Sequence, residues 1–117
     1  GVIVSKKKVK DLTLDMKYTF YEKSVQNTEA EVDNLNKFYE EAYGKKPYTL
    51  REDFCGTGML MCDWVKQGKK YEAIGLDLDP EPISIGKERH LSKLTKQEQS
   101  RVDYIQANVM EPNATRP

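Results

Sequence analysis

LREDFCGTG, residues Leu50–Gly58, is the stretch around which we expect the chain to fold. Residues 48–50 are typical of a short strand, and apolar residues at helical spacing follow the stretch up to Gly68, a natural helix cap. These apolar residues are Met59, Leu60, Met61, Trp64 and Val65. Glycines allow a ligand to approach the backbone, and the first turn of a helix offers N–H groups to it. The stretch therefore predicts a binding site for a small polar molecule.

Two further strands are predicted after this helix. Residues 71–78 hold a continuous apolar run, which suits a strand covered on both faces of a parallel sheet. Asp79 and Pro80 then predict the start of a helix that runs to about residue 93, and residues 102–107 form the last strand. The alternation of strands and helices predicts an α/β fold, a Rossmann-like doubly wound parallel sheet, of which only the first half, three strands, is present.

A covering helix is predicted before the first strand. Thr28 and Glu31 fit a capping box, an apolar stripe follows, and Gly44 with Pro47 ends the helix. The stripe consists of Val32, Leu35, Phe38, Tyr39 and Ala42. We therefore divide the chain into residues 1–47, an N-terminal segment with this helix, and residues 48–117, the sheet. The tyrosines and phenylalanine at 18–21 favour simple packing, with closure of a tyrosine over the central turn as the alternative.

Composition excludes several classes of partner. The 117 residues include 19 basic and 19 acidic side chains, so no overall field draws the chain to nucleic acid or membrane, and we expect neither as a partner. The basic run at residues 6–8 is typical of a solvated tail. Two cysteines, Cys55 and Cys62, form no disulfide framework, and no zinc-ligand spacing occurs. We expect a cytoplasmic protein without a bound metal.

The predicted strand ends bring a second set of candidate residues together. Ligands of open parallel sheets bind beyond the carboxyl ends of the strands. Asp77 follows the glycine turn at about the 20-residue interval at which an acid meets a ribose diol. Asn108 offers the donor and acceptor that an adenine edge requires, and Leu78 and Val109 would hold the base between apolar faces. Taken singly, Asp77 and Asn108 would be residues that end a strand and form a turn.

These segments resemble a known family. The run Asp53–Gly58 looks like the first motif of the class I S-adenosylmethionine-dependent methyltransferases, residues 75–80 look like the second, and residues 106–112 look like the third, where Asp is commoner than Asn. The nearest likeness is a bacterial subgroup with an Arg-Glu-Asp-Phe-Cys-Gly-Thr turn. The resemblance covers about residues 18–112. It implies a methyltransferase that binds S-adenosyl-L-methionine and transfers a methyl group to an unidentified acceptor.

The resemblance also assigns residues. Glu52 takes the position of the first acid, with Asp53 sharing that role, and Phe54 stands where the family usually has its first glycine. Asp77 would bind the ribose hydroxyls and Asn108 the adenine amino group. The implied cofactor-binding residues are Glu52, Asp53, Phe54, Cys55, Gly56, Thr57, Gly58, Asp77, Leu78, Asn108 and Val109. Tyr21 and Arg51 are candidates for the substrate, with a structural salt bridge as the preferred use of Arg51, and no catalytic residue is assigned.

The family's substrate-facing groups usually follow a fourth strand, which this sequence does not contain. We therefore expect the chain to be the N-terminal portion of a larger methyltransferase, inactive alone, in which the missing half or a partner chain covers the edge of the first strand. Two other functions stay open. An NAD(P)-binding oxidoreductase would need glycine where Met61 stands, because Met61 would crowd the approach of helix and strand. A non-catalytic interaction module would use the tyrosine-rich helix as its contact face.

Overall fold

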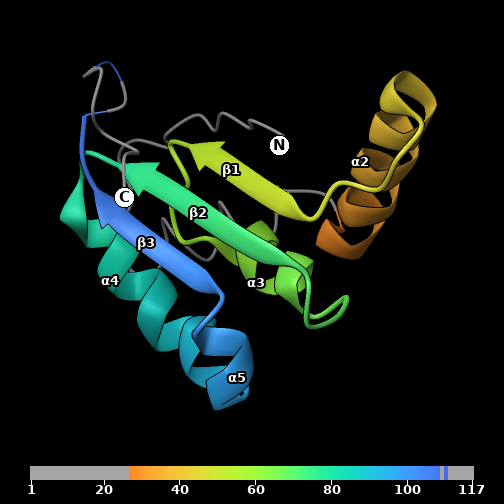
Figure 1. Ribbon diagram of the computed structural model, residues 1–117. Coiled ribbons are helices and arrows are strands. Elements are labelled where there is room, and N and C mark those ends of the chain that lie inside the picture. The colour runs from red at the N-terminus through yellow and green to blue at the C-terminus, as the bar shows by residue number, and fades with distance from the viewer. Residues whose placement is uncertain (1–26, 109, 111–117) are drawn as a thin grey trace.

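A three-stranded parallel sheet in the order β1-β2-β3 forms the centre of the molecule (Figure 1). The computed structural model describes residues 27–108 and residue 110. The strands are β1 (Thr49–Asp53), β2 (Glu72–Asp77) and β3 (Val102–Gln106). The helices are α2 (Thr28–Tyr43), α3 (Met59–Val65), α4 (Pro80–Arg89) and α5 (Lys96–Gln99), with the 3-10 turn η1 at Leu91–Lys93. The chain therefore has the α/β, Rossmann-like architecture that the order of its elements predicted.

Strand register determines which side chains form the core. Leu50 lies opposite Ala73, and Ala73 lies opposite Val102, so these three side chains point to the same side of the sheet. All three are buried in one apolar cluster with the fully buried Trp64 of α3. The helices α3 and α4 lie on this side of the sheet (Figure 1). The apolar pattern of β2 and α3 thus predicted the core correctly.

Helix α2 joins this core through Val32, but its ends and its stripe differ from the prediction. Asn27, not Thr28, caps the helix, because the Asn27 side chain accepts hydrogen bonds from the backbone N–H groups of Glu29 and Ala30. Thr28 instead donates its hydroxyl to Asp63 of α3. Phe38 is 72% exposed, so the apolar stripe is only partly covered by the described residues. The end of α2 at Gly44, in the left-handed conformation, is as predicted.

The connection from α3 to β2 is longer than predicted, because α3 ends at Val65 and not at Gly68. Arg101, the residue before β3, donates hydrogen bonds to backbone carbonyl groups of this connection. Its Nη1 donates to the carbonyl oxygens of Val65, Gly68 and Tyr71 at 2.8, 2.6 and 2.7 Å. One side chain from a distant part of the sequence therefore holds the loop and stops the helix.

Two glycines allow the helix layer to approach the sheet closely. A Cβ atom on Gly75 of β2 would lie 2.5 Å from the Met61 sulfur of α3. The Met61 side chain of α3 therefore packs against the sheet where Gly75 leaves room for it. A Cβ atom on Gly86 of α4 would lie 1.9 Å from the backbone oxygen of Thr57. This second contact presses α4 against the turn between β1 and α3.

The outer edge of β1 is where we expected a missing half of the protein or a partner chain to pair. Within residues 27–108 and 110, β1 pairs with β2 alone, so its other edge meets no strand of that part of the chain. Cover for this edge from a further half of the protein or from a partner stays a prediction, as does the division at residue 47. In the part of the chain that the structure describes, no helix is both long enough and apolar enough to cross a membrane.

Candidate functional site

The turn between β1 and α3 forms the centre of the candidate site. Phe54, Gly56 and Gly58 have φ angles of 62°, 59° and 73°, so the chain takes the left-handed conformation at three places within five residues. Glycine adopts this conformation readily, whereas a residue with a Cβ pays about 1 kcal/mol for it. Phe54 thus has a backbone conformation that favours glycine, and its ring remains 45% exposed.

Asp77 ties this turn to the end of β2. Its Oδ2 accepts the backbone N–H of Gly56 at 3.0 Å, and its Oδ1 accepts that of Asp79 at 3.0 Å. The residue is only 7% exposed. A carboxylate has about four lone-pair positions, so these two bonds leave acceptor capacity on each oxygen. Asp77 is therefore a structural brace of the turn with capacity for a second partner.

Tyr104 of β3 supports the same turn from the helix side of the sheet. Its hydroxyl donates to the Thr57 carbonyl oxygen at 2.7 Å and lies 3.7 Å from the Cys62 sulfur. Burial raises the pKa of Tyr104 and raises that of the Cys62 thiol to about 11, and the nearby charge of Glu52 adds to both shifts. A Cβ on Gly58 would lie 2.5 Å from the Tyr104 oxygen, so packing alone requires glycine there.

The other predicted site residues lie at different depths. Glu52 is fully buried on the helix side of β1, and the side chains of Cys55 and Thr57 are also buried. Cys55 and Thr57 can therefore offer a ligand only their backbone groups. Asp53 accepts the Arg51 side chain at 2.9 Å, which is the structural salt bridge preferred for Arg51. Val109 and Tyr21 lie outside the described residues.

Two exposed residues at the carboxyl edge complete the site. Leu78 is 63% exposed, although it directly follows the buried Asp77. Asn108 is exposed beyond the end of β3, and its side-chain oxygen accepts the backbone N–H of Met110 at 2.9 Å. With Phe54, these residues surround the buried turn with a partly apolar rim. Asp53 and Asp79 also stand at this edge, where Asp53 is paired with Arg51.

Sequence reasoning missed the residues that hold the turn in place. Tyr104 and Gly86 contact Thr57 from segments that lie far from it in the sequence. The only local signal was a glycine inside an otherwise helical pattern at Gly86, which often indicates close packing. Among the described residues, no three His, Cys, Asp or Glu side chains gather in a way that could hold a metal ion.

Comparison with known proteins identifies the fold. A crystal structure of the methyltransferase domain of a bacterial Hen1, CtHen1-CN, superposes with a TM-score of 0.54 at 16% sequence identity. The match covers 70% of this chain and 42% of that chain, so this chain spans less than half of the matched domain's length. No protein-family model and no curated protein matches the sequence. The chain therefore has a methyltransferase-like fold.

Proposed function

We propose that the chain is the cofactor-binding portion of an S-adenosyl-L-methionine-dependent methyltransferase. The observation that carries the proposal is the braced turn between β1 and α3, which takes the left-handed conformation at three residues, one of which, Gly56, donates its N–H to the Asp77 carboxylate at the carboxyl edge of a parallel sheet. Ligands of such sheets bind at this edge. The methyltransferase-like fold supports the same conclusion.

The residues at the rim fit the chemistry of this cofactor. The remaining lone pairs of Asp77 suit the ribose hydroxyls, because a carboxylate accepts from two donors at once. Asn108 already uses its oxygen to accept from Met110, so its NH₂ group would donate to an adenine ring nitrogen. Leu78 and Phe54 offer exposed apolar surface for the adenine or for the methyl-bearing end of the cofactor.

Charge at the rim favours this cofactor over a nicotinamide dinucleotide. S-adenosylmethionine carries a sulfonium and an ammonium group against one carboxylate, whereas NAD carries an anionic pyrophosphate. Asp77 and Asp79 would attract the first and repel the second, whereas the charge of Asp53 is offset by its ion pair with Arg51. The backbone N–H groups that a pyrophosphate needs are also engaged, since Gly56 donates to Asp77 and Gly58 donates to the Cys55 carbonyl oxygen.

The chemistry that this site supplies is positioning. Methyl transfer from a sulfonium is an in-line displacement, in which the bound cofactor supplies the methyl group and the protein holds both reactants in line. The braced turn would hold the methionine part of the cofactor still, because Tyr104 and Gly86 restrain Thr57 from behind. The methyl acceptor would approach from the open carboxyl edge.

Calorimetry on the purified chain tests the proposal. We expect S-adenosylmethionine and S-adenosylhomocysteine to bind and NAD not to bind. Asp77→Asn should weaken S-adenosylmethionine binding by about 10- to 100-fold, because hydrogen bonds to a charged group contribute roughly 1.5–3 kcal/mol. Asp103→Asn, at an exposed position of β3, is the matched control and should leave the affinity unchanged. Binding of NAD alone would indicate an oxidoreductase, and binding of none of the three an interaction module.

A further inference from the structure

The amino edge of the sheet carries a basic and aromatic surface that the proposed methyltransferase function does not use. Lys45 and Lys46 precede β1, while Lys69 and Lys70 precede β2. Parallel strands begin at the same edge, and Thr49 lies opposite Glu72, so the two lysine pairs lie on adjacent segments. We call the six residues Tyr39, Lys45, Lys46, Tyr48, Lys69 and Lys70 the amino-edge patch.

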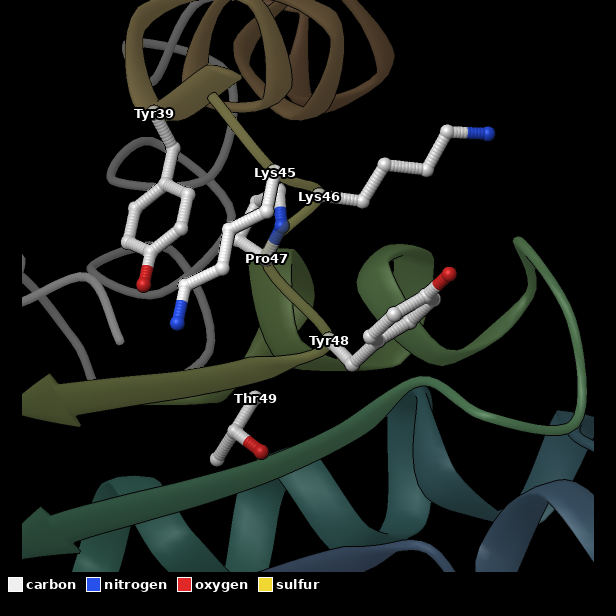
Figure 2. A pocket seen from close by; sticks show the side chains of 6 residues that line it. All are labelled: Tyr39, Lys45, Lys46, Pro47, Tyr48 and Thr49. Atoms are coloured by element: carbon white, nitrogen blue, oxygen red, sulfur yellow. The ribbon is translucent and has the colours of Figure 1, made fainter. Parts of the chain in front are cut away.

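Part of this patch surrounds a pocket of about 460 Å³ between the end of α2 and the start of β1. Its lining residues are Tyr39, Lys45, Lys46, Pro47, Tyr48 and Thr49. Figure 2 shows the Lys45 side chain extending toward the Tyr39 side of the pocket, whereas Lys46 and the Tyr48 ring lie on the other side. Positive charge and aromatic surface therefore occur together on both sides of the pocket.

Tyr48 is held in place by its neighbours, while part of its ring stays accessible. The Tyr48 backbone oxygen accepts the Trp64 indole N–H at 3.1 Å and the Glu72 N–H at 3.0 Å. The ring packs edge-on against Tyr71 with 5.0 Å between centroids, and Lys70 Nζ lies 5.7 Å from the Tyr48 ring centroid. The side chain is nevertheless 38% exposed. A rigid, partly exposed ring beside a cation loses little entropy when a planar group stacks on it.

Charge in the patch is unbalanced even though the whole chain is neutral. Among residues 27–108 and 110, none of the four lysines forms an ion pair with a carboxylate. The acid nearest to them in the register, Glu72, accepts the Thr49 hydroxyl at 3.2 Å. The rim of the candidate cofactor site lies at the opposite ends of the strands. The four lysines thus share the amino edge with Glu72, whereas Asp77 and Asp79 lie at the carboxyl edge.

We propose that the amino-edge patch binds single-stranded nucleic acid, with phosphates on the lysines and a base stacked on Tyr48. Lysines beside an accessible ring are the elements that bind single strands without sequence preference. A duplex would leave the ring unused, because its bases are already stacked. An anionic membrane would use the lysines but not the ring. The five residues of β1 separate the patch from the glycine turn by about 17 Å, so the bound segment is distinct from the cofactor site.

The test is fluorescence anisotropy with a fluorescein-labelled dT12 oligonucleotide. Binding should weaken with salt, with a log–log slope of about −2 to −3, because three or four phosphate contacts each contribute about 0.7 on a single strand. The double variant Lys45→Glu/Lys46→Glu should bind at least 10-fold more weakly, and Lys69→Glu/Lys70→Glu should do the same. Tyr48→Leu should weaken binding about 5-fold or more through the lost stacking.

The control is Lys87→Glu/Lys93→Glu, which makes the same change in charge on α4 and η1 and should alter the affinity less than twofold. Thermal melting of every variant checks the fold, and the two independent lysine pairs keep the test informative if one pair fails to fold. Absence of dT12 binding by the wild-type chain, or equal loss in the control, would overturn the proposal. So would binding to phosphatidylserine vesicles as strong as to dT12 and unaffected by Tyr48→Leu, because that result indicates a membrane.

Discussion

Gly86→Ala gives the sharpest test of how α4 supports the candidate site. Gly86 lies inside α4, where its carbonyl accepts the His90 N–H at 2.8 Å. By helix propensity alone, alanine at an interior position should stabilise the protein by about 1 kcal/mol. The structure predicts the opposite sign, because the added Cβ would lie 1.9 Å from the Thr57 backbone oxygen.

The size of the effect follows from that distance. Real Cβ contacts are essentially never shorter than 3.0 Å, so α4 and the turn must separate by at least 1.1 Å, the difference between 3.0 and 1.9 Å. The obstacle is backbone, which cannot rotate away as a side chain would. Overpacking of a well-packed interior costs about 1–3 kcal/mol, and we place this case at the upper end. After the gain in propensity, the net loss should be about 1–2 kcal/mol.

Urea denaturation followed by circular dichroism measures this loss. Ser84→Ala, at an exposed position of the same helix, is the matched control and should stabilise by up to about 0.5 kcal/mol. Because the displaced atom belongs to the turn of the candidate site, Gly86→Ala should also weaken S-adenosylmethionine binding, whereas Ser84→Ala should not. A Gly86→Ala protein as stable as the wild type or more stable would refute the reasoning.

Three further predictions follow from single contacts. Phe54→Gly should be more stable than Phe54→Ala by about 1 kcal/mol, because φ is 62° there, and a reversed order in urea titrations would contradict the strained geometry. Arg101→Met should lower the free energy of unfolding by about 2–4 kcal/mol, since three backbone carbonyls lose their donor. Arg101→Lys should restore part of this loss. If the Arg101→Met variant were as stable as the wild type in the same titration, the hydrogen bonds of Arg101 would not stabilise the loop. Stability should fall as pH rises between about 9 and about 11, because burial raises the pKa of the Cys62 thiol to about 11 in the folded protein, whereas the unfolded chain has the ordinary pKa of 9.0. Cys62→Ala should reduce this slope by up to roughly 1.4 kcal/mol per pH unit, and an unchanged slope would argue against a buried neutral thiol.

Much of the fold was accessible from local pattern. The apolar run at residues 73–76 predicted a buried strand over residues 71–78, observed as β2 from Glu72 to Asp77. Asp79 caps α4 by accepting the Glu81 N–H, with Pro80 in the first turn, as predicted. These features depend on residues within a few positions of one another. The interactions that form them lie within one short segment, so they can be predicted from the sequence alone.

The local sequence pattern predicted helix ends less reliably where a residue far away in the sequence binds the groups at that end. The capping box at Thr28 was wrong because Asn27 satisfies the same backbone donors one residue earlier, while Asp63 takes the Thr28 hydroxyl. The end of α3 was wrong because Arg101 binds the carbonyl groups beyond Val65. Each error involves a partner more than ten residues away.

The sequence by itself determined the order of strands and helices, the buried strand, the cap of α4 and the glycine turn, because these arise from interactions within a single turn or strand. Only the tertiary structure decided that Asp77 braces Gly56, that Tyr104 and Gly86 hold Thr57, and that two lysine pairs share one edge of the sheet. Such contacts depend on strand register and on the distance between layers. Both are properties of the packed whole, since a shift of one residue in register would turn the side chains of the shifted strand, such as Tyr104 of β3, to the other face of the sheet.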